Sequence, residues 1–164
     1  MEDIFNLSFD DIVNKPPDNE VSKKETLEKR FTKERLEWSN KIDLMSKKMK
    51  DITKINELMV EVYSERQIAV EYYHYLISIL SKLNKNYRAQ WAQKYDYYSY
   101  KSQQRFPNEK LKERQILSEI APILSKREDV DNHSKFIDNT IKTIDNIIYG
   151  IKYRIELENI ARGK

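Results

Sequence analysis

The stretch Ile137–Ile155, which reads IDNTIKTIDNIIYGIKYRI, decides the fold class of this 164-residue chain. Isoleucine recurs along it at alternating steps of four and three residues, and this spacing places the side chains on one stripe of an α-helix. Isoleucine at both core positions of such a stripe is typical of parallel coiled coils larger than a dimer. We therefore predict that these residues form an oligomerisation seam. They are Ile137, Ile141, Ile144, Ile148, Ile151 and Ile155.

The helix that carries this seam is predicted to begin at Ser125 and to end near Ala161. Ser125 and Glu128 have the spacing of a capping box, in which each side chain bonds the other residue's backbone N–H. Gly163 stands where a C-cap glycine belongs. Gly150 lies on another face of the same helix, where the lack of a side chain permits a close approach by a neighbour.

No proline or glycine interrupts the chain from Asp18 to Phe106, so long helices are predicted there as well. One helix over this range would be about 130 Å long at about 1.5 Å per residue, so we expect a break. A second capping-box pair, Ser64 and Gln67, marks its predicted place. Apolar positions on both sides of this break follow the alternating spacing. They are Trp38, Ile42, Met45, Met49, Ile52 and Met59, with the polar Asn56 among them, and then Ala69, Tyr73, Leu76, Leu80, Leu83 and Tyr87.

These patterns predict an all-α protein with long helices in coiled-coil-like packing, whose C-terminal helix forms a homo-oligomeric assembly. Only 2 glycines and 4 prolines occur, and 35% of the residues are charged. The predicted organisation is an N-terminal arm and linker at 1–18, a long helical hairpin domain at 19–106 that carries a nucleic-acid-binding strip, and C-terminal helices for oligomerisation at 107–164. Ser22 with Glu25 is predicted to open the first helix. Asn108 caps a short helix to about Ser118, which Pro122 ends.

The first 14 residues combine acids with apolar side chains, a composition that fits either docking onto a partner or packing on the protein's own or a neighbouring subunit. This segment lacks the basic and apolar regions of a secretory signal. No apolar run approaches the roughly 20 residues needed to span a bilayer. We therefore expect a location in the cytoplasm.

Signatures of enzymes and of cofactor sites are missing from the sequence. Two isolated glycines exclude a phosphate-binding loop. There is no cysteine, and His74 and His133 lie too far apart for a metal-binding motif, so a structural role is predicted for both. The carboxylates occur as single charges on helix faces rather than as acid and base pairs. We therefore predict no catalytic residue, no metal site and no cofactor.

The stretch Lys82–Phe106, KLNKNYRAQWAQKYDYYSYKSQQRF, concentrates positive charge and aromatic rings. Asp96 is its one acid. Cations release counterions from phosphates, and aromatic faces stack unpaired bases, so this composition predicts binding of a polyanion such as single-stranded DNA. The predicted contact residues are Lys82, Lys85, Arg88, Lys94, Tyr98, Lys101 and Arg105. The alternative is that Tyr87, Trp91 and Tyr95, four residues apart, belong to the core.

Three short motifs resemble the T4-type phage recombination mediator family (UvsY). Tyr149-Gly150-Ile151-Lys152, followed by Ile155-Glu156 and by the ending from Ile160 to Lys164, is similar to the family's C-terminal signature. KYDYYS at 94–99 and LSKREDV at 124–130 resemble two further family segments. The family's basic pair before Tyr-Tyr is matched only at Lys94, because Ala92 occupies the other position. Tyr100-Lys101 replaces the family's glycine after Tyr-Tyr-Ser.

This resemblance implies a phage protein in the host cytoplasm that binds single-stranded DNA and loads a recombinase onto strands coated by a single-strand-binding protein. It also implies a ring of about six or seven subunits, built through the C-terminal helices. Two other classes stay open from the residues alone. One is a structural or scaffolding coiled-coil phage protein without nucleic-acid binding, and the other is a membrane-surface binder that uses the tyrosine-rich basic helix.

Overall fold

A computed structural model describes residues 26–163 of the chain. Every regular element in this range is helical, which confirms the all-α prediction. The elements are α2 (Leu27–Lys48), the short 3-10 helix η1 (Ile52–Lys54), α3 (Ile55–Asp96), the π-helical turn η2 (Tyr97–Lys101), α4 (Glu109–Glu119) and α5 (Ala121–Ala161). The predicted arm at 1–18 and the capping box of Ser22 and Glu25 lie outside the described residues.

Contacts divide the chain into two compact units, and α3 and α5 contribute to both. Unit 1 contains residues 76–132 and the two described residues before Glu28. Unit 2 contains residues 28–75 and the chain from His133 onward. The predicted domain boundary between residues 106 and 107 falls inside unit 1.

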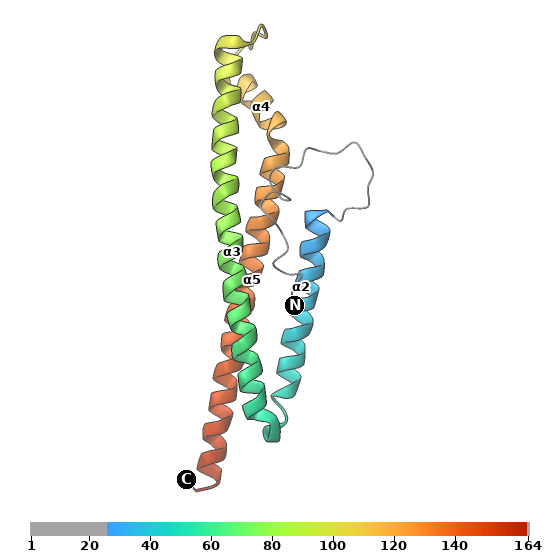
Figure 1. The fold of residues 1–164 in the computed structure, drawn as a ribbon, viewed down its shortest axis with the longest axis vertical. Coiled ribbons are helices and arrows are strands. Elements are labelled where there is room, and N and C mark those ends of the chain that lie inside the picture. Colours follow the sequence, from blue (N-terminus) through green and yellow to red (C-terminus); the bar gives the residue numbers. More distant parts are fainter. Residues whose placement is uncertain (1–25, 164) are drawn as a thin grey trace. The chain divides into compact units, whose positions relative to one another are not determined.

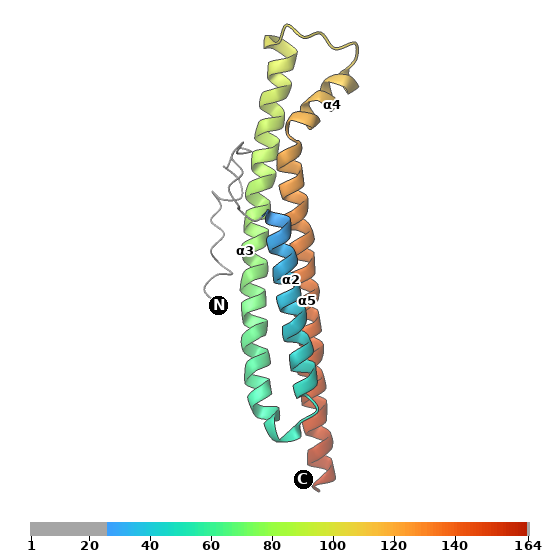
Figure 2. The same ribbon diagram turned by 90° about the vertical axis from the view of Figure 1, so that its right-hand side faces the viewer.

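Unit 2 consists of three helical segments that run side by side: α2, the first half of α3 and the second half of α5 (Figures 1 and 2). Ion pairs between the helices show their register. Lys48 pairs with Glu61 and Lys41 with Glu65, each at 2.7 Å, so α2 and α3 are antiparallel. One guanidinium of α3 also joins α5, because Arg66 Nε lies 2.6 Å from Asp145 Oδ1.

The core of unit 2 follows a stripe of α3 with alternating steps of three and four. Its buried residues on this helix are Ile55, Leu58, Val62, Ala69 and Tyr72. Ala69, the first residue of the second predicted apolar series, is buried as expected. Tyr73, by contrast, is half-buried, and its neighbour Tyr72 takes the core position.

The isoleucine seam of α5 lies in this same core. Ile137, Ile144 and Ile151 are 0% exposed and Ile148 is 5% exposed, while Ile141 and Ile155 are half-buried. The 4-3 pattern therefore reports packing against α2 and α3 of the same chain. Apolar periodicity has the same form whether the partner helix is intramolecular or intermolecular, and so it could not identify the partner.

The predicted helix break at Ser64 is wrong. Helix α3 continues through Ser64, and the chain reverses between Lys48 and Ile55 instead. There Asp51 Oδ1 accepts hydrogen bonds from the backbone N–H and the hydroxyl of Thr53, at 3.1 and 2.7 Å. This local turn competes with the helix, whereas the buried stripe on both sides of Ser64 favours its continuation.

Helix α5 packs against the connection between α2 and α3. The guanidinium of Arg154 donates to the carbonyl oxygens of Met49 and Lys50, which follow the C-terminus of α2. A Cβ atom on Gly150 would lie 2.8 Å from the Met49 methyl group, so the predicted close approach is present. Gly163 ends the described chain at φ 69°, the left-handed conformation expected of a C-cap glycine.

Unit 1 contains the second half of α3, the turn η2, α4 and the first turns of α5. Its buried apolar residues are Leu76, Ile79, Leu83, Ile116, Ile120 and Val130. Asn108 caps α4 as predicted, because its side chain accepts a hydrogen bond from the Leu111 N–H at 3.0 Å. Helix α5 begins at Ala121, four residues before the prediction, since Pro122 falls in the first turn, where a helix does not need its N–H.

Candidate nucleic-acid interface

The cations of the predicted strip fall into two groups in unit 1. Lys85, Arg88, Lys101 and Arg105 are exposed and make no ion pair with another described residue. Lys82 is exposed as well and has an interaction of its own. Lys82, Lys85 and Arg88 share the exposed face of α3 with Ala89 and Ala92, so no acid lies between them on that face. Lys85 and Arg88 can therefore contact phosphates without first breaking an ion pair with a described residue.

Lys94 is in a different position. Its ammonium lies 2.6 Å from Glu119 Oε2 on α4, and its side chain is 42% exposed. The hydrogen bond to Glu119 raises the pKa of Lys94. The same bond, with one from Tyr98, lowers the pKa of Glu119 to about 2. Lys94 is therefore held as an anchor for α4, and a phosphate would have to compete with Glu119 for it.

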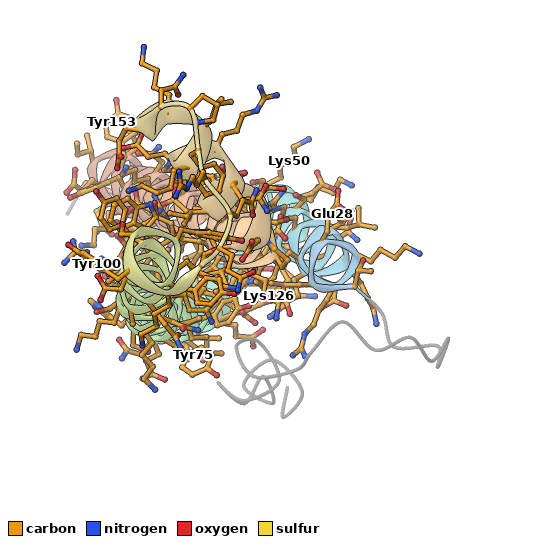
Figure 3. The ribbon with its side chains drawn as sticks, turned by 90° about the horizontal axis from the view of Figure 1, so that it is seen from above. Glu28, Lys50, Tyr75, Tyr100, Lys126 and Tyr153 are labelled. Atoms are coloured by element: carbon orange, nitrogen blue, oxygen red, sulfur yellow. The ribbon has the colours of Figure 1, made fainter. Side chains whose placement is uncertain are left out.

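Tyr98, the one aromatic residue among the predicted contacts, takes part in the same anchor. Its hydroxyl donates to Glu119 Oε1, and its ring packs edge-to-face against Phe106 with centroids 5.3 Å apart. The prominently exposed ring of the turn is Tyr100, at 83%, while Tyr97 is 47% exposed. Figure 3 labels Tyr100 at the outside of its helix. Neither Tyr97 nor Tyr100 is among the predicted contact residues. Their position outside the apolar spacing was nevertheless a sign in the sequence that they lie at the surface.

The aromatic residues upstream are half-buried, in line with the alternative of a packing role. Trp91 and Tyr95 stack at 5.0 Å, and the Arg127 guanidinium lies 5.6 Å from the centre of the Tyr87 ring. Because these rings already have partners, bases would have to stack elsewhere.

Three basic residues of α4 were not among the predicted contact residues. Lys112 is buried: its ammonium lies 4.0 Å from the centre of the Tyr95 ring, 3.0 Å from Ser99 Oγ and 3.0 Å from Glu109 Oε1. Lys110 and Arg114 are exposed, and neither makes an ion pair with a described residue. Their spacing of four places them on one face of α4, a signal that the sequence did contain.

A structural role was predicted for both histidines, and burial supports it for His133 alone. His133 is fully buried in unit 2, and His74 is exposed. Within residues 26–163, no three His, Asp or Glu side chains gather closely enough to hold a metal ion. In that same range no helix has the length and apolar character needed to cross a membrane.

Unit 2 carries a second exposed feature, an apolar face formed by α3 and α5. Its members are Val60 and Tyr63 on α3, and Tyr149, Tyr153, Leu157 and Ile160 on α5, which are 45–72% exposed. The pKa of Arg66 is raised mainly by Asp145 and in smaller part by Tyr63 and Tyr149, so both tyrosines lie near this ion pair. The last turns of α5 extend past the α2–α3 connection (Figures 1 and 2). We call these six residues the outer face.

A search of protein-family models finds no match to this chain, and neither do searches of curated proteins and of solved structures.

Proposed function

We propose that this protein binds single-stranded DNA through the exposed cations of unit 1 and acts as a recombination mediator. One observation carries the proposal: Lys85, Arg88, Lys101 and Arg105 are all exposed and form no ion pair with a described residue, along one continuous stretch of chain. The motif resemblance at 94–99, 124–130 and 149–164 supports the finer assignment, which is loading of a recombinase onto strands coated by a single-strand-binding protein.

The proposed mechanism needs no catalytic residue. Each cation that reaches a phosphate releases counterions, which favours binding at low salt and makes it sensitive to salt. Exposed Tyr97 and Tyr100 add aromatic surface on which a base of any sequence can stack. Several copies of such a strip in one oligomer would bind a strand tightly through avidity, and the strand would then be bent or wrapped while one coat protein leaves and the recombinase enters.

The oligomer is proposed to form through the outer face. The isoleucine seam is already covered within the chain, whereas Tyr149, Tyr153 and Ile160 are 63–72% exposed on the same helix. Large exposed apolar patches on soluble domains typically mark interaction sites. The C-terminal helix therefore keeps its predicted role in assembly, but with a different set of residues.

The test is single-stranded DNA binding measured against salt concentration. Replacing Lys85, Arg88 and Lys101 together by alanine should weaken binding and reduce the steepness of log K against log salt by about 2, at about 0.7 for each lost phosphate contact. The matched control replaces three exposed cations of unit 2, Lys33, Lys50 and Lys152, which removes the same charge elsewhere.

An unchanged salt dependence in the strip variant would contradict the assignment, as would an equal loss in the control variant. A wild-type protein that leaves an oligonucleotide unshifted in low salt would instead favour the scaffolding function. Loading activity is tested separately, by whether the protein speeds recombinase assembly on a strand coated beforehand with single-strand-binding protein.

A further inference from the structure

A hollow of about 520 Å³ lies in unit 1, where η2 and the following loop meet the start of α4. It is lined by Tyr98, Ser99, Ser102, Gln104, Arg105, Phe106, Asn108, Glu109 and Lys112. Its volume falls in the range of about 300–1,000 Å³ that small-molecule sites occupy. Most of these side chains lie outside the exposed α3 face that would follow the strand, so the proposed function leaves the hollow without a role.

The charges of the lining leave one cation unmatched. The Lys112 ammonium is balanced by Glu109 at 3.0 Å, and hydrogen bonds from Tyr95 and Lys112 lower the pKa of that carboxyl group. Arg105 lines the hollow, is exposed, and makes no ion pair with another described residue. A planar guanidinium suits the oxygens of a phosphate group. The Arg105 side of the hollow can therefore bind an anion.

The remaining lining suits a flat ring with polar edges. Tyr98 and Phe106 meet edge-to-face at an interplanar angle of 88°, and Phe106 is half-buried. Around them stand the amides of Gln104 and Asn108 and the hydroxyls of Ser99 and Ser102, which offer donors and acceptors of both kinds. An anion beside an apolar ring with hydrogen-bonding edges is the chemistry of a nucleotide.

The walls of the hollow are held in place before any ligand binds. Lys112 joins α4 to η2 through Ser99 Oγ, and it also lies against the Tyr95 ring at 4.0 Å. Gln104 N–H donates to Ser102 Oγ at 3.0 Å, which shapes the loop. The turn η2 is π-helical, a rare geometry that is frequently found at functional sites.

We infer that this hollow receives one nucleotide of the bound strand, with the base against Phe106 and the phosphate at Arg105. The inference rests on the proposed function and adds one defined base-binding pocket to a strip that otherwise contacts phosphates and offers exposed rings for stacking. It predicts that the protein distinguishes a strand with bases from one without them at a single defined place.

The experiment compares oligothymidylate with an abasic strand of equal length, using the full-length protein at one salt concentration. Wild-type protein should prefer the strand with bases. Phe106→Leu keeps an apolar group beside Tyr98 but removes the ring, and it should reduce this preference by about tenfold. Tyr73→Leu is the matched control, because it removes a half-buried ring of α3 that neither lines the hollow nor belongs to the proposed strip.

Arg105→Gln should weaken binding of both strands about equally, with Arg114→Gln as its control on α4. Thymidine monophosphate should change the NMR signals of the hollow's residues more strongly in wild type than in Phe106→Leu, whereas inorganic phosphate alone should change them equally in both proteins. Circular dichroism checks that each variant keeps its helix content.

The inference is overturned if Phe106→Leu and Tyr73→Leu have the same effect on the preference, or if Phe106→Leu has none while oligothymidylate still binds. That result would leave the proposed function intact. If neither strand binds wild-type protein in low salt, the proposed function itself fails, and this inference fails with it.

Discussion

Glu34 of α2 is the least exposed Asp, Glu, Lys or Arg among the described residues of unit 2. It is 7% exposed, and its carboxylate accepts a hydrogen bond from the Tyr72 hydroxyl at 2.5 Å and from Arg30 Nε at 3.1 Å. His133 Nε2 lies 2.9 Å from the same carboxylate. The His133 ring stacks on Phe31 with centroids 4.1 Å apart. One carboxylate thus joins α2 to α3 and α5.

The tautomer of His133 follows from its surroundings. Its Nδ1 is buried and has no hydrogen-bond partner among the described residues. A neutral ring with the proton on Nε2 donates to Glu34 and leaves Nδ1 as a bare acceptor, whereas a protonated ring would bury an unpaired N–H as well. We therefore assign a proton to Nε2, which donates to the carboxylate of Glu34.

This network makes unfolding stability depend on pH. Burial alone would raise the pKa of Glu34, but the hydrogen bonds from His133, Tyr72 and Arg30 outweigh it and the pKa is lowered. A lowered carboxyl pKa contributes stability above the usual value of about 4.5, and that contribution is lost as the pH falls through the folded-state value. The protein should therefore lose stability in acid partly through this residue.

Glu34→Gln tests this at the scale of one residue. The amide keeps the shape but loses the charge, so we expect the free energy of unfolding at pH 7 to fall by about 1–3 kcal/mol. The difference between variant and wild type should shrink toward pH 3. Urea unfolding followed by circular dichroism at pH 7 and pH 3 measures the free energy of unfolding of both proteins. Glu37→Gln, at an exposed position of α2, should leave this free energy unchanged at both pH values. A Glu34→Gln difference of equal size at pH 7 and pH 3 would refute the proposed pH dependence.

Among the elements, α4 decides how much of the predicted strip is accessible. Glu119, at the C-terminal end of α4, binds both Lys94 and Tyr98 of the preceding segment. The two residues that the motif resemblance emphasised are therefore engaged within the chain and not free to contact DNA. An exposed ion pair of this kind adds only modest stability, about 0–1 kcal/mol. Its larger consequence is competition with phosphate for the Lys94 ammonium.

Glu119→Gln should therefore strengthen single-stranded DNA binding. The change frees Lys94, so we expect higher affinity and an increase of up to about 0.7 in the salt-dependence slope, since one more phosphate contact becomes available. Fluorescence anisotropy with a labelled oligonucleotide at several salt concentrations measures both quantities. Glu113→Gln removes the same charge from an exposed position of α4 and should give only a small, general increase. Equal gains from the two variants would show that Lys94 is not released.

At the scale of the whole molecule, the distinction between core and outer face decides how assembly must be tested. An aspartate at Ile148 or Ile151 would place a charge in the core of unit 2, and burial of an unpaired charge costs several kcal/mol. A loss of assembly in such a variant would therefore report unfolding. The informative substitutions are on the outer face, where the side chains are exposed in the single chain.

We predict that Tyr153→Asp combined with Ile160→Asp lowers the mass in light scattering and leaves the helix content unchanged. Ile148→Asp combined with Ile151→Asp should instead reduce the helix content itself. Circular dichroism on the same samples separates the two outcomes. An outer-face variant that keeps the wild-type oligomeric mass, or a wild-type protein that is monomeric at micromolar concentration, would refute assembly through this face.

Much of the fold followed from local patterns, because caps and breakers act within a few residues. Asn108 and Gly163 have the predicted roles. The break at Ser64 failed because a capping-box pattern is weak evidence when an apolar stripe continues through it. In the candidate interface, the charge pattern selected Lys85, Arg88, Lys101 and Arg105, which are exposed, while their contact with DNA stays a prediction. It could not reveal that Glu119, 21 residues beyond Tyr98 and 25 beyond Lys94, binds both of these side chains.

By itself, the sequence determined that the chain is helical, which positions are apolar, and where positive charge gathers, because periodicity and composition are properties of the chain alone. Only the tertiary structure decided what each apolar stripe packs against and which cations are engaged. An amphipathic helix buries its apolar face against whichever helix is available, and an ion pair forms between residues that folding brings together. The isoleucine seam thus belongs to the core of unit 2, and the outer face stays exposed, which is why we propose it for contact with a second copy.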